Sequence, residues 1–192
     1  MKKIFALFLV LILAAAPVYS VEEAEEYKLK RVSTENAGTV SIPAKWLISE
    51  QDLEPGYYDD MKMNMQRALH MHATGRNSKG ELLDEPGRYS TIMIHVCWPA
   101  RLSPYELLMI VYQTIAANDE SVNLLTVENF KEKNASSITY TSSFLGMFEL
   151  RSKLIAFKSG DKLLYMNMAY FPDYEDAWIT MAKDILASWE ID

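Results

Sequence analysis

The order of the predicted elements constrains the fold of this chain more than any other feature. Alternating apolar and polar side chains predict strands early in the chain, then an amphipathic helix, then four more strands and a second helix. The strands are expected over 27–32, 38–46, 60–74, 88–98, 123–130, 136–144, 147–158 and 162–171. Strands and helices do not alternate one by one, which argues against a parallel sheet. The order predicts an α+β domain, a mainly antiparallel sheet flanked by two principal helices.

Both helices and one turn carry local signals. Ser103 followed by Pro104 and Glu106 predicts a capped start for the first helix. Asp173 is expected to cap the last helix. The segment Ser-Gly-Asp at 159–161 has the composition of a tight hairpin turn between the last two strands. The apolar stripe of the last helix is expected to comprise Trp178, Met181, Ala182, Ile185 and Trp189.

The first twenty residues have the pattern of a signal peptide. The cationic start MKK precedes an uninterrupted apolar run of 13 residues at 4–16, which is too short to span a bilayer comfortably. We expect cleavage between Ser20 and Val21, with a competing site after Ala16; an uncleaved N-terminal anchor is the alternative. Residues 1–20 are therefore predicted to be a signal peptide and 21–192 a single domain, periplasmic or secreted, without a stable membrane span.

Charge and cysteine content narrow the possible partners and the source of stability. Loss of Lys2 and Lys3 with the signal peptide leaves 17 basic and 26 acidic residues, a formal net charge of −9. Nucleic acids and anionic lipids require a basic face, so neither is expected as the main partner. Cys97 is the single cysteine of the chain, so no intramolecular disulfide can form and the apolar core must supply the stability.

Two short motifs carry a family resemblance. A V-S-I-P-x-x-W segment ends a strand with Pro43 and Trp46, and the closing helix has the form A-x-x-I-L-x-S-W, sealed by Ile185 and Trp189. Together with the antiparallel meander between them, these motifs resemble the PsbP/DcrB-like superfamily. The resemblance implies a small αβα sandwich used in binding or accessory roles, in most members not an enzyme. It implies no catalytic motif and assigns no site residue.

One group of residues could bind a metal. The common hydrolase, redox and nucleotide-binding signatures are absent. All three histidines and the cysteine lie in two neighbouring predicted strands, His70 and His72 in one and His95 and Cys97 in the other. In a hairpin with aligned apolar faces all four would share one side, and imidazole and thiolate are ligands for Zn²⁺ and copper. The simpler interpretation is a set of hydrogen-bonded histidines without a cofactor.

The methionines near these histidines suggest a second arrangement of soft metal ligands. The tracts M-K-M-N-M and H-M-H follow one another closely. In a continuous strand Met61, Met63, Met65 and Met71 would face away from the even-numbered histidines, which favours a core role for them. A bulge between Met65 and His70 would change that conclusion. The spacing of Met65 and Leu69 also fits a helix.

The sequence favours binding over catalysis. Cys97 and His95 could form a thiol nucleophile and its base, but strand neighbours two apart have Cα atoms roughly 6.5 Å apart, which is marginal. We predict a non-catalytic exported domain that binds an envelope protein or a small ligand; a periplasmic metal-binding protein and an enzyme without a recognised signature are the alternatives. The candidate partner contacts are tyrosines near the ends of predicted elements: Tyr57, Tyr58, Tyr105, Tyr112, Tyr170 and Tyr174. Border tyrosines with the hydroxyl group in water are an equally good interpretation. A deep polar pocket would favour the enzyme, and an exposed apolar patch would favour the binding protein.

Overall fold

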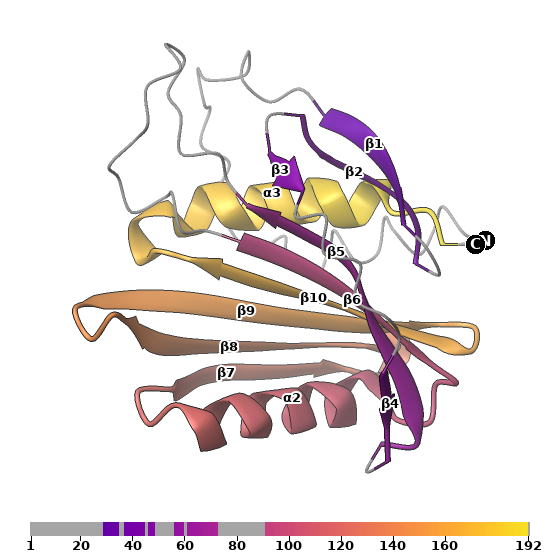
Figure 1. The fold of residues 1–192 in the computed structure, drawn as a ribbon, viewed down its shortest axis with the longest axis horizontal. Helices are drawn as coiled ribbons and strands as arrows, with labels where there is room; N and C mark the ends of the chain where they lie inside the picture. The colour runs from indigo at the N-terminus through magenta and orange to yellow at the C-terminus, as the bar shows by residue number, and fades with distance from the viewer. Residues whose placement is uncertain are drawn as a thin grey trace.

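The described part of the chain is an α+β domain. The computed structural model describes residues 29–34, 37–44, 46–48, 56–59, 61–72 and 91–191; the predicted signal peptide lies outside them. A large antiparallel sheet and two helices make up the described part (Figure 1), which confirms the predicted fold class at this level. Within these ranges, no helix is long and apolar enough to cross a bilayer.

The main sheet has eight strands, and a separate hairpin has two. The spatial order of the main sheet is β3 (Leu47–Ile48), β5 (Met63–His72), β6 (Thr91–Trp98), β10 (Lys162–Tyr170), β9 (Phe148–Ser159), β8 (Ala135–Phe144) and β7 (Asn123–Phe130), with β4 (Gly56–Tyr58) also paired to β5. The separate hairpin is β1 (Leu29–Thr34) and β2 (Gly38–Pro43). The helices are α2 (Pro104–Asn118) and α3 (Glu175–Ser188), and the short 3₁₀ turns are η2 (Lys131–Lys133) and η3 (Pro172–Tyr174).

The first helix begins as predicted and the last one does not. The Glu106 backbone N–H donates to Ser103 Oγ at 3.2 Å, and the Ser103 backbone N–H donates to the Glu106 carboxylate at 2.7 Å. This is the predicted capping box. Asp173 lies within η3, ahead of the first residue of α3. Our expectation that Asp173 caps α3 directly is wrong, because a 3₁₀ turn separates it from the helix.

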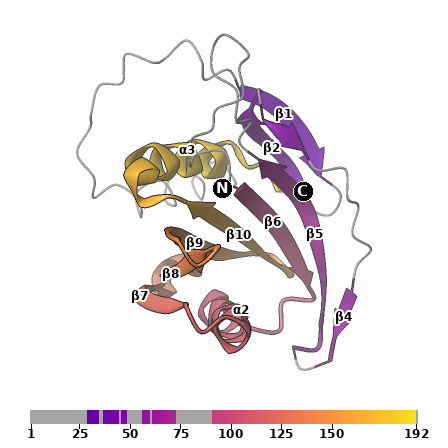
Figure 2. The same ribbon diagram turned by 60° about the vertical axis from the view of Figure 1, so that its left-hand side comes forward.

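The two faces of the sheet belong to different cores. We call the face that packs with α3 the α3 face; its cluster contains Leu69, Met71, Ile92, Ile94, Leu164, Met166, Trp178, Ala182 and Ile185. We call the other face the α2 face; its cluster contains Met63, Cys97, Leu107, Leu108, Leu154, Leu163 and Tyr165. Figure 2 shows α2 and α3 as separate coils with the sheet between them. This arrangement is consistent with a sandwich.

Trp46 and Trp189, two of the motif residues that carry the family resemblance, lie where α3 packs against the β1–β2 hairpin. Trp189 Nε1 donates to the Ala37 carbonyl at 2.6 Å, and the ring of Trp46 lies 5.0 Å from the ring of Trp178. Gly38 has φ +85°, and a Cβ there would meet the Glu190 carbonyl oxygen at 2.1 Å. The hairpin can approach the end of α3 this closely because position 38 carries no side chain.

Candidate functional site

The structure places the four candidate metal residues on one face of β5 and β6. Cys97 pairs with Met65, His95 with Arg67, and His72 with Thr91. Because directly opposed residues of an antiparallel pair share a face, the register places backbone positions 70 (opposite Met93), 72, 95 and 97 on the α2 face. The predicted common side is therefore confirmed by the strand register.

The same register separates the four residues along the strands. Thr91, the residue opposite His72, lies six residues from Cys97 along β6, which corresponds to about 20 Å of extended chain. A single ion cannot contact both ends of such a row. Within the ranges that the structure covers, no group of three or more His, Cys, Asp and Glu side chains could hold a metal ion. The side chain of His72 lies outside the described atoms.

A bulge in β5 changes the expected orientation of the methionines. The pairing of β5 with β6 shifts between Arg67 and Leu69, so the strand is not continuous in its alternation. Met65 consequently opposes Cys97 and shares a face with His95, whereas Met71 opposes Ile92 on the α3 face. The prediction that methionines and histidines face opposite ways is wrong for Met65 and also for Met61 and Met63, which belong to the α2-face cluster with Cys97; it holds for Met71.

The environment of His95 and Cys97 keeps both groups uncharged at neutral pH. His95 stacks on Tyr165 with ring centroids 4.4 Å apart and an interplanar angle of 4°. Burial, together with the positive charges of Arg67 and His70, lowers the pKa of His95 from 6.5 to about 4. Burial raises the pKa of the Cys97 thiol to about 12. A protonated, fully buried thiol is not an activated nucleophile.

A second surface feature lies at one end of the sheet, where strands β8 and β9 turn. Phe144 pairs with Phe148, so Leu145, Gly146 and Met147 form a three-residue loop. Leu145 and Met147 are 70% and 71% exposed, and Phe148 is 49% exposed. We call Leu145, Met147 and Phe148 the apolar tip. In Figure 1 this turn is the left-hand end of the sheet.

The hairpin that carries the apolar tip extends beyond both of its neighbours. Pairing of β8 with β7 stops at Thr141, and pairing of β9 with β10 stops at Arg151. The tip is nevertheless held at its base. The Ser143 backbone N–H donates to Ser121 Oγ at 2.8 Å, and the Phe148 ring contacts the Phe171 ring edge to face at 6.3 Å.

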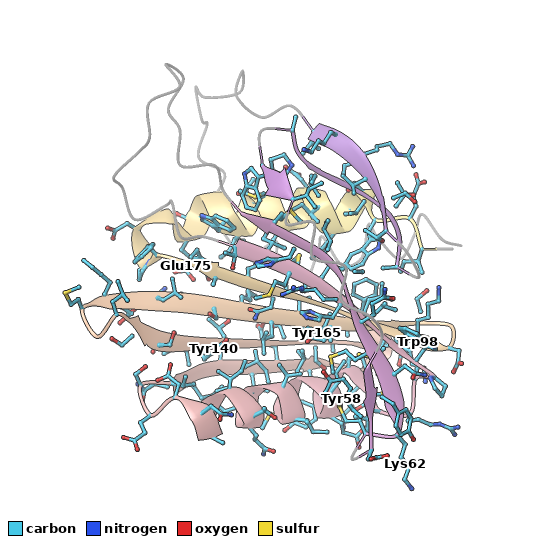
Figure 3. All side chains as sticks on the ribbon, viewed as in Figure 1. Tyr58, Lys62, Trp98, Tyr140, Tyr165 and Glu175 are labelled. Carbon is cyan, nitrogen blue, oxygen red and sulfur yellow. The ribbon has the colours of Figure 1, made fainter. Side chains whose placement is uncertain are left out.

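A charged contact fixes the other side of this hairpin base. Arg151 forms an ion pair with Glu175, the first residue of α3, and Tyr170 Oη donates to the other oxygen of the Glu175 carboxylate at 3.3 Å. Figure 3 shows Glu175 at the same end of the molecule as the β8–β9 turn. The base of the tip is therefore bound to the loop after α2 and to the start of α3.

The backbone of the apolar tip adopts a conformation that leucine rarely takes. Leu145 has φ +55° and Gly146 has φ +68°. The left-handed region costs an L-residue with a Cβ roughly 1–2 kcal/mol, and Asn, Asp and Gly tolerate it best. A sequence selected only for stability would place one of those residues at 145. An exposed leucine with a positive φ is therefore not explained by the stability of the turn.

Acidic residues border the apolar tip. Glu149 follows Phe148 directly, and Asp119 and Glu120 lie in the loop whose Ser121 accepts the hydrogen bond from Ser143. All three carboxylates are exposed. Arg151 is engaged by Glu175 and also lies 3.7 Å from Glu149. The tip is thus an apolar projection with an acidic border.

The strands expected over 136–144 and 147–158 place a turn here, as the structure does, but the sequence analysis did not identify its apolar side chains as an exposed surface. The available signal was an apolar residue on each side of the single glycine of a hairpin turn. Of the candidate tyrosines, Tyr57, Tyr58 and Tyr105 are exposed, as a partner surface would require, and Tyr112 is half-buried. The prediction is wrong for Tyr170, which is fully buried in the α3-face core; the side chain of Tyr174 lies outside the described atoms.

The comparison with solved structures gives the same fold. Cyanobacterial PsbP (CyanoP) from Synechocystis sp. PCC 6803 aligns over 92% of this chain and 100% of its own, with 13% identity and a TM-score of 0.54. The Ran-binding protein Mog1p from Saccharomyces cerevisiae aligns over 86% and 96%, with 9% identity and a TM-score of 0.53. No family model matches the chain, and no curated protein sequence matches it. The resemblance to the PsbP-like superfamily is confirmed at the level of the fold.

Proposed function

We propose that this protein is an exported, non-catalytic accessory domain that binds a protein of the cell envelope through the apolar tip. The observation that carries the proposal is Leu145, an exposed leucine held in a left-handed conformation at the end of an anchored hairpin. Rigid apolar side chains that are already positioned before binding lose little entropy on association. The fold shared with CyanoP and Mog1p, a Ran-binding protein, supports a binding role.

The acidic border indicates the chemistry of the partner. An anionic bilayer surface would repel Glu149, Asp119 and Glu120, so the tip is poorly suited to insert into such a membrane. A protein with an apolar pocket and a basic rim complements both features. The partner is therefore a protein, and the apolar pocket on it receives Leu145 and Met147.

Two properties of the α2 face argue against a thiol enzyme. The single thiol of the chain is buried and protonated at neutral pH, and the His95 ring is stacked on Tyr165. Neither group has the activated state that a thiol enzyme requires.

Site-specific photocrosslinking tests the proposal. A photoreactive amino acid is placed at Met147 and, as the matched control, at Asp161 in the turn at the opposite end of β9. Irradiation of the native host should give one adduct of defined mass from position 147 and none from 161. Mass spectrometry of that adduct should identify an envelope protein, and mature chains should begin at Val21. No adduct from position 147, or the same adducts from both positions, would overturn the proposal.

A further inference from the structure

A group of soft donor atoms lies on the α2 face where β5 and β6 pair. Met65 supplies a thioether and directly opposes Cys97, which supplies a thiol. His95, two residues before Cys97, supplies an imidazole whose Nδ1 is buried without a hydrogen-bond partner among the described residues. We propose that these three side chains bind a monovalent copper ion, Cu(I).

Tyr165 contacts two of the three donors. It opposes His95 on β10, and its ring stacks on the imidazole at 4.4 Å. Its hydroxyl reaches across β6 and donates a hydrogen bond to Met65 Sδ at 3.6 Å, which coordination of an ion by that sulfur would replace. The side chain of Tyr165 thus touches two of the donors and passes over the strand that carries the third. Figure 3 shows Tyr165 in the middle of the sheet, between Tyr140 and Trp98.

The donor types select Cu(I) over the divalent ions. Thioether and thiolate sulfur are soft ligands that Cu(I) prefers, and imidazole is a suitable third ligand. None of the strands β5, β6 and β10 contains Asp or Glu. Arg67 opposes His95, and its positive charge repels a divalent ion more strongly than a monovalent one. Binding would displace the Cys97 thiol proton to solvent.

The β5 bulge makes this donor set possible. Leu69 and Met71 lie on the α3 face, so without the shift between Arg67 and Leu69 the alternation would place Met65 on that face too, away from His95 and Cys97. Met65 and His95 are half-buried, whereas Cys97 is fully buried. An ion can therefore reach the first two donors from the surface and the thiol last.

Cu(I) titration of the purified protein tests the site. Under anaerobic conditions with ascorbate, competition against bicinchoninate should show one tightly bound ion per chain. Met65→Leu and His95→Gln should each weaken binding by about 10- to 100-fold. Met71→Leu, the same change on the opposite face of the same strand, and Met147→Leu at the exposed tip should bind as the unchanged protein does. Absence of binding, or equal affinity of Met65→Leu and Met71→Leu, would overturn the proposal.

X-ray absorption of the Cu(I)-loaded, unsubstituted protein tests the donors without depending on how any variant folds. Two sulfur scatterers and one nitrogen are expected in the first coordination sphere. A sphere of nitrogen and oxygen alone would overturn the proposal. The double variant His70→Ala/His72→Ala should keep its Cu(I) affinity, and loss of binding in this variant would assign the ion to the histidine pair instead.

Discussion

The two turns at the ends of strand β9 both connect antiparallel neighbours, but one turn is polar and the other is apolar. The β9–β10 turn is polar, with Gly160 at φ +58° and Asp161 beside it, and the Ala100 backbone N–H donates to the Asp161 carbonyl at 2.8 Å. The β8–β9 turn is apolar and places Leu145 at φ +55°. The first turn has the residues that its geometry requires, and the second does not. The difference supports the proposed role of the apolar tip in binding.

The largest expected effect concerns the base of the apolar tip. Phe171 is buried, and the Phe148 ring packs against it. Phe171→Ala should lower the free energy of unfolding by about 3 kcal/mol, because a large buried ring is removed and a cavity remains. Urea-induced unfolding measures this change. A loss below about 1 kcal/mol would show that the tip does not depend on this contact.

A smaller effect is expected when the glycine of each turn is replaced. A Cβ at Gly146 or at Gly160 would meet no atom within 4 Å, so only the positive φ angles of +68° and +58° resist substitution. Gly146→Ala and Gly160→Ala should each lower the free energy of unfolding by about 1–2 kcal/mol. Thermal unfolding compares the two. Markedly unequal losses would mean that the turns differ in something besides their side chains.

Replacement of Leu145 should change the free energy of unfolding in the opposite direction. Leu145→Asn should raise the free energy of unfolding by about 0.5–1 kcal/mol, because Asn tolerates the left-handed region and little apolar contact is lost from a side chain 70% exposed. Chemical denaturation checks the sign. A decrease would show that Leu145 contributes to the core and would remove the argument from strain.

The smallest effect is expected at the polar turn. The Asp161 carboxylate accepts a 3.3 Å hydrogen bond from the Ala100 backbone N–H, which also donates to the Asp161 carbonyl. Asp161→Ala removes only the exposed side-chain bond and should lower the free energy of unfolding by about 0.5 kcal/mol. Thermal melts compare it with Gly160→Ala. A loss as large as that of Gly160→Ala would mean that the carboxylate, not the glycine, determines this turn.

Local signals predicted the elements that depend on local structure. The range 123–130 is strand β7 to the residue, and the capping box of α2 was visible in Ser103 and Glu106 because its partners are three residues apart. The position of Asp173 within η3 could not be predicted, because a 3₁₀ turn and a helix start share the same residue preferences.

The group of Met65, His95 and Cys97 and the apolar tip both depend on features that the alternation of apolar and polar residues does not encode. One inserted residue between Arg67 and Leu69 moves Met65 to the face of His95, and no residue in that stretch has the composition of a bulge. The exposure of Leu145 depends on where β7 and β10 stop pairing, which is a tertiary property. The sequence could predict that His95 and Cys97 share a face, but not that Met65 lies on the same face.

The most direct test of the account measures stability and binding on the same variant. Leu145→Asn is prepared with the photoreactive amino acid at Met147, and its unfolding and its crosslinking are compared with those of the chain that keeps Leu145. The account predicts a more stable protein that no longer forms the partner adduct. A variant that is equally or less stable, or one that forms the adduct undiminished, would contradict the assignment of the apolar tip to partner binding.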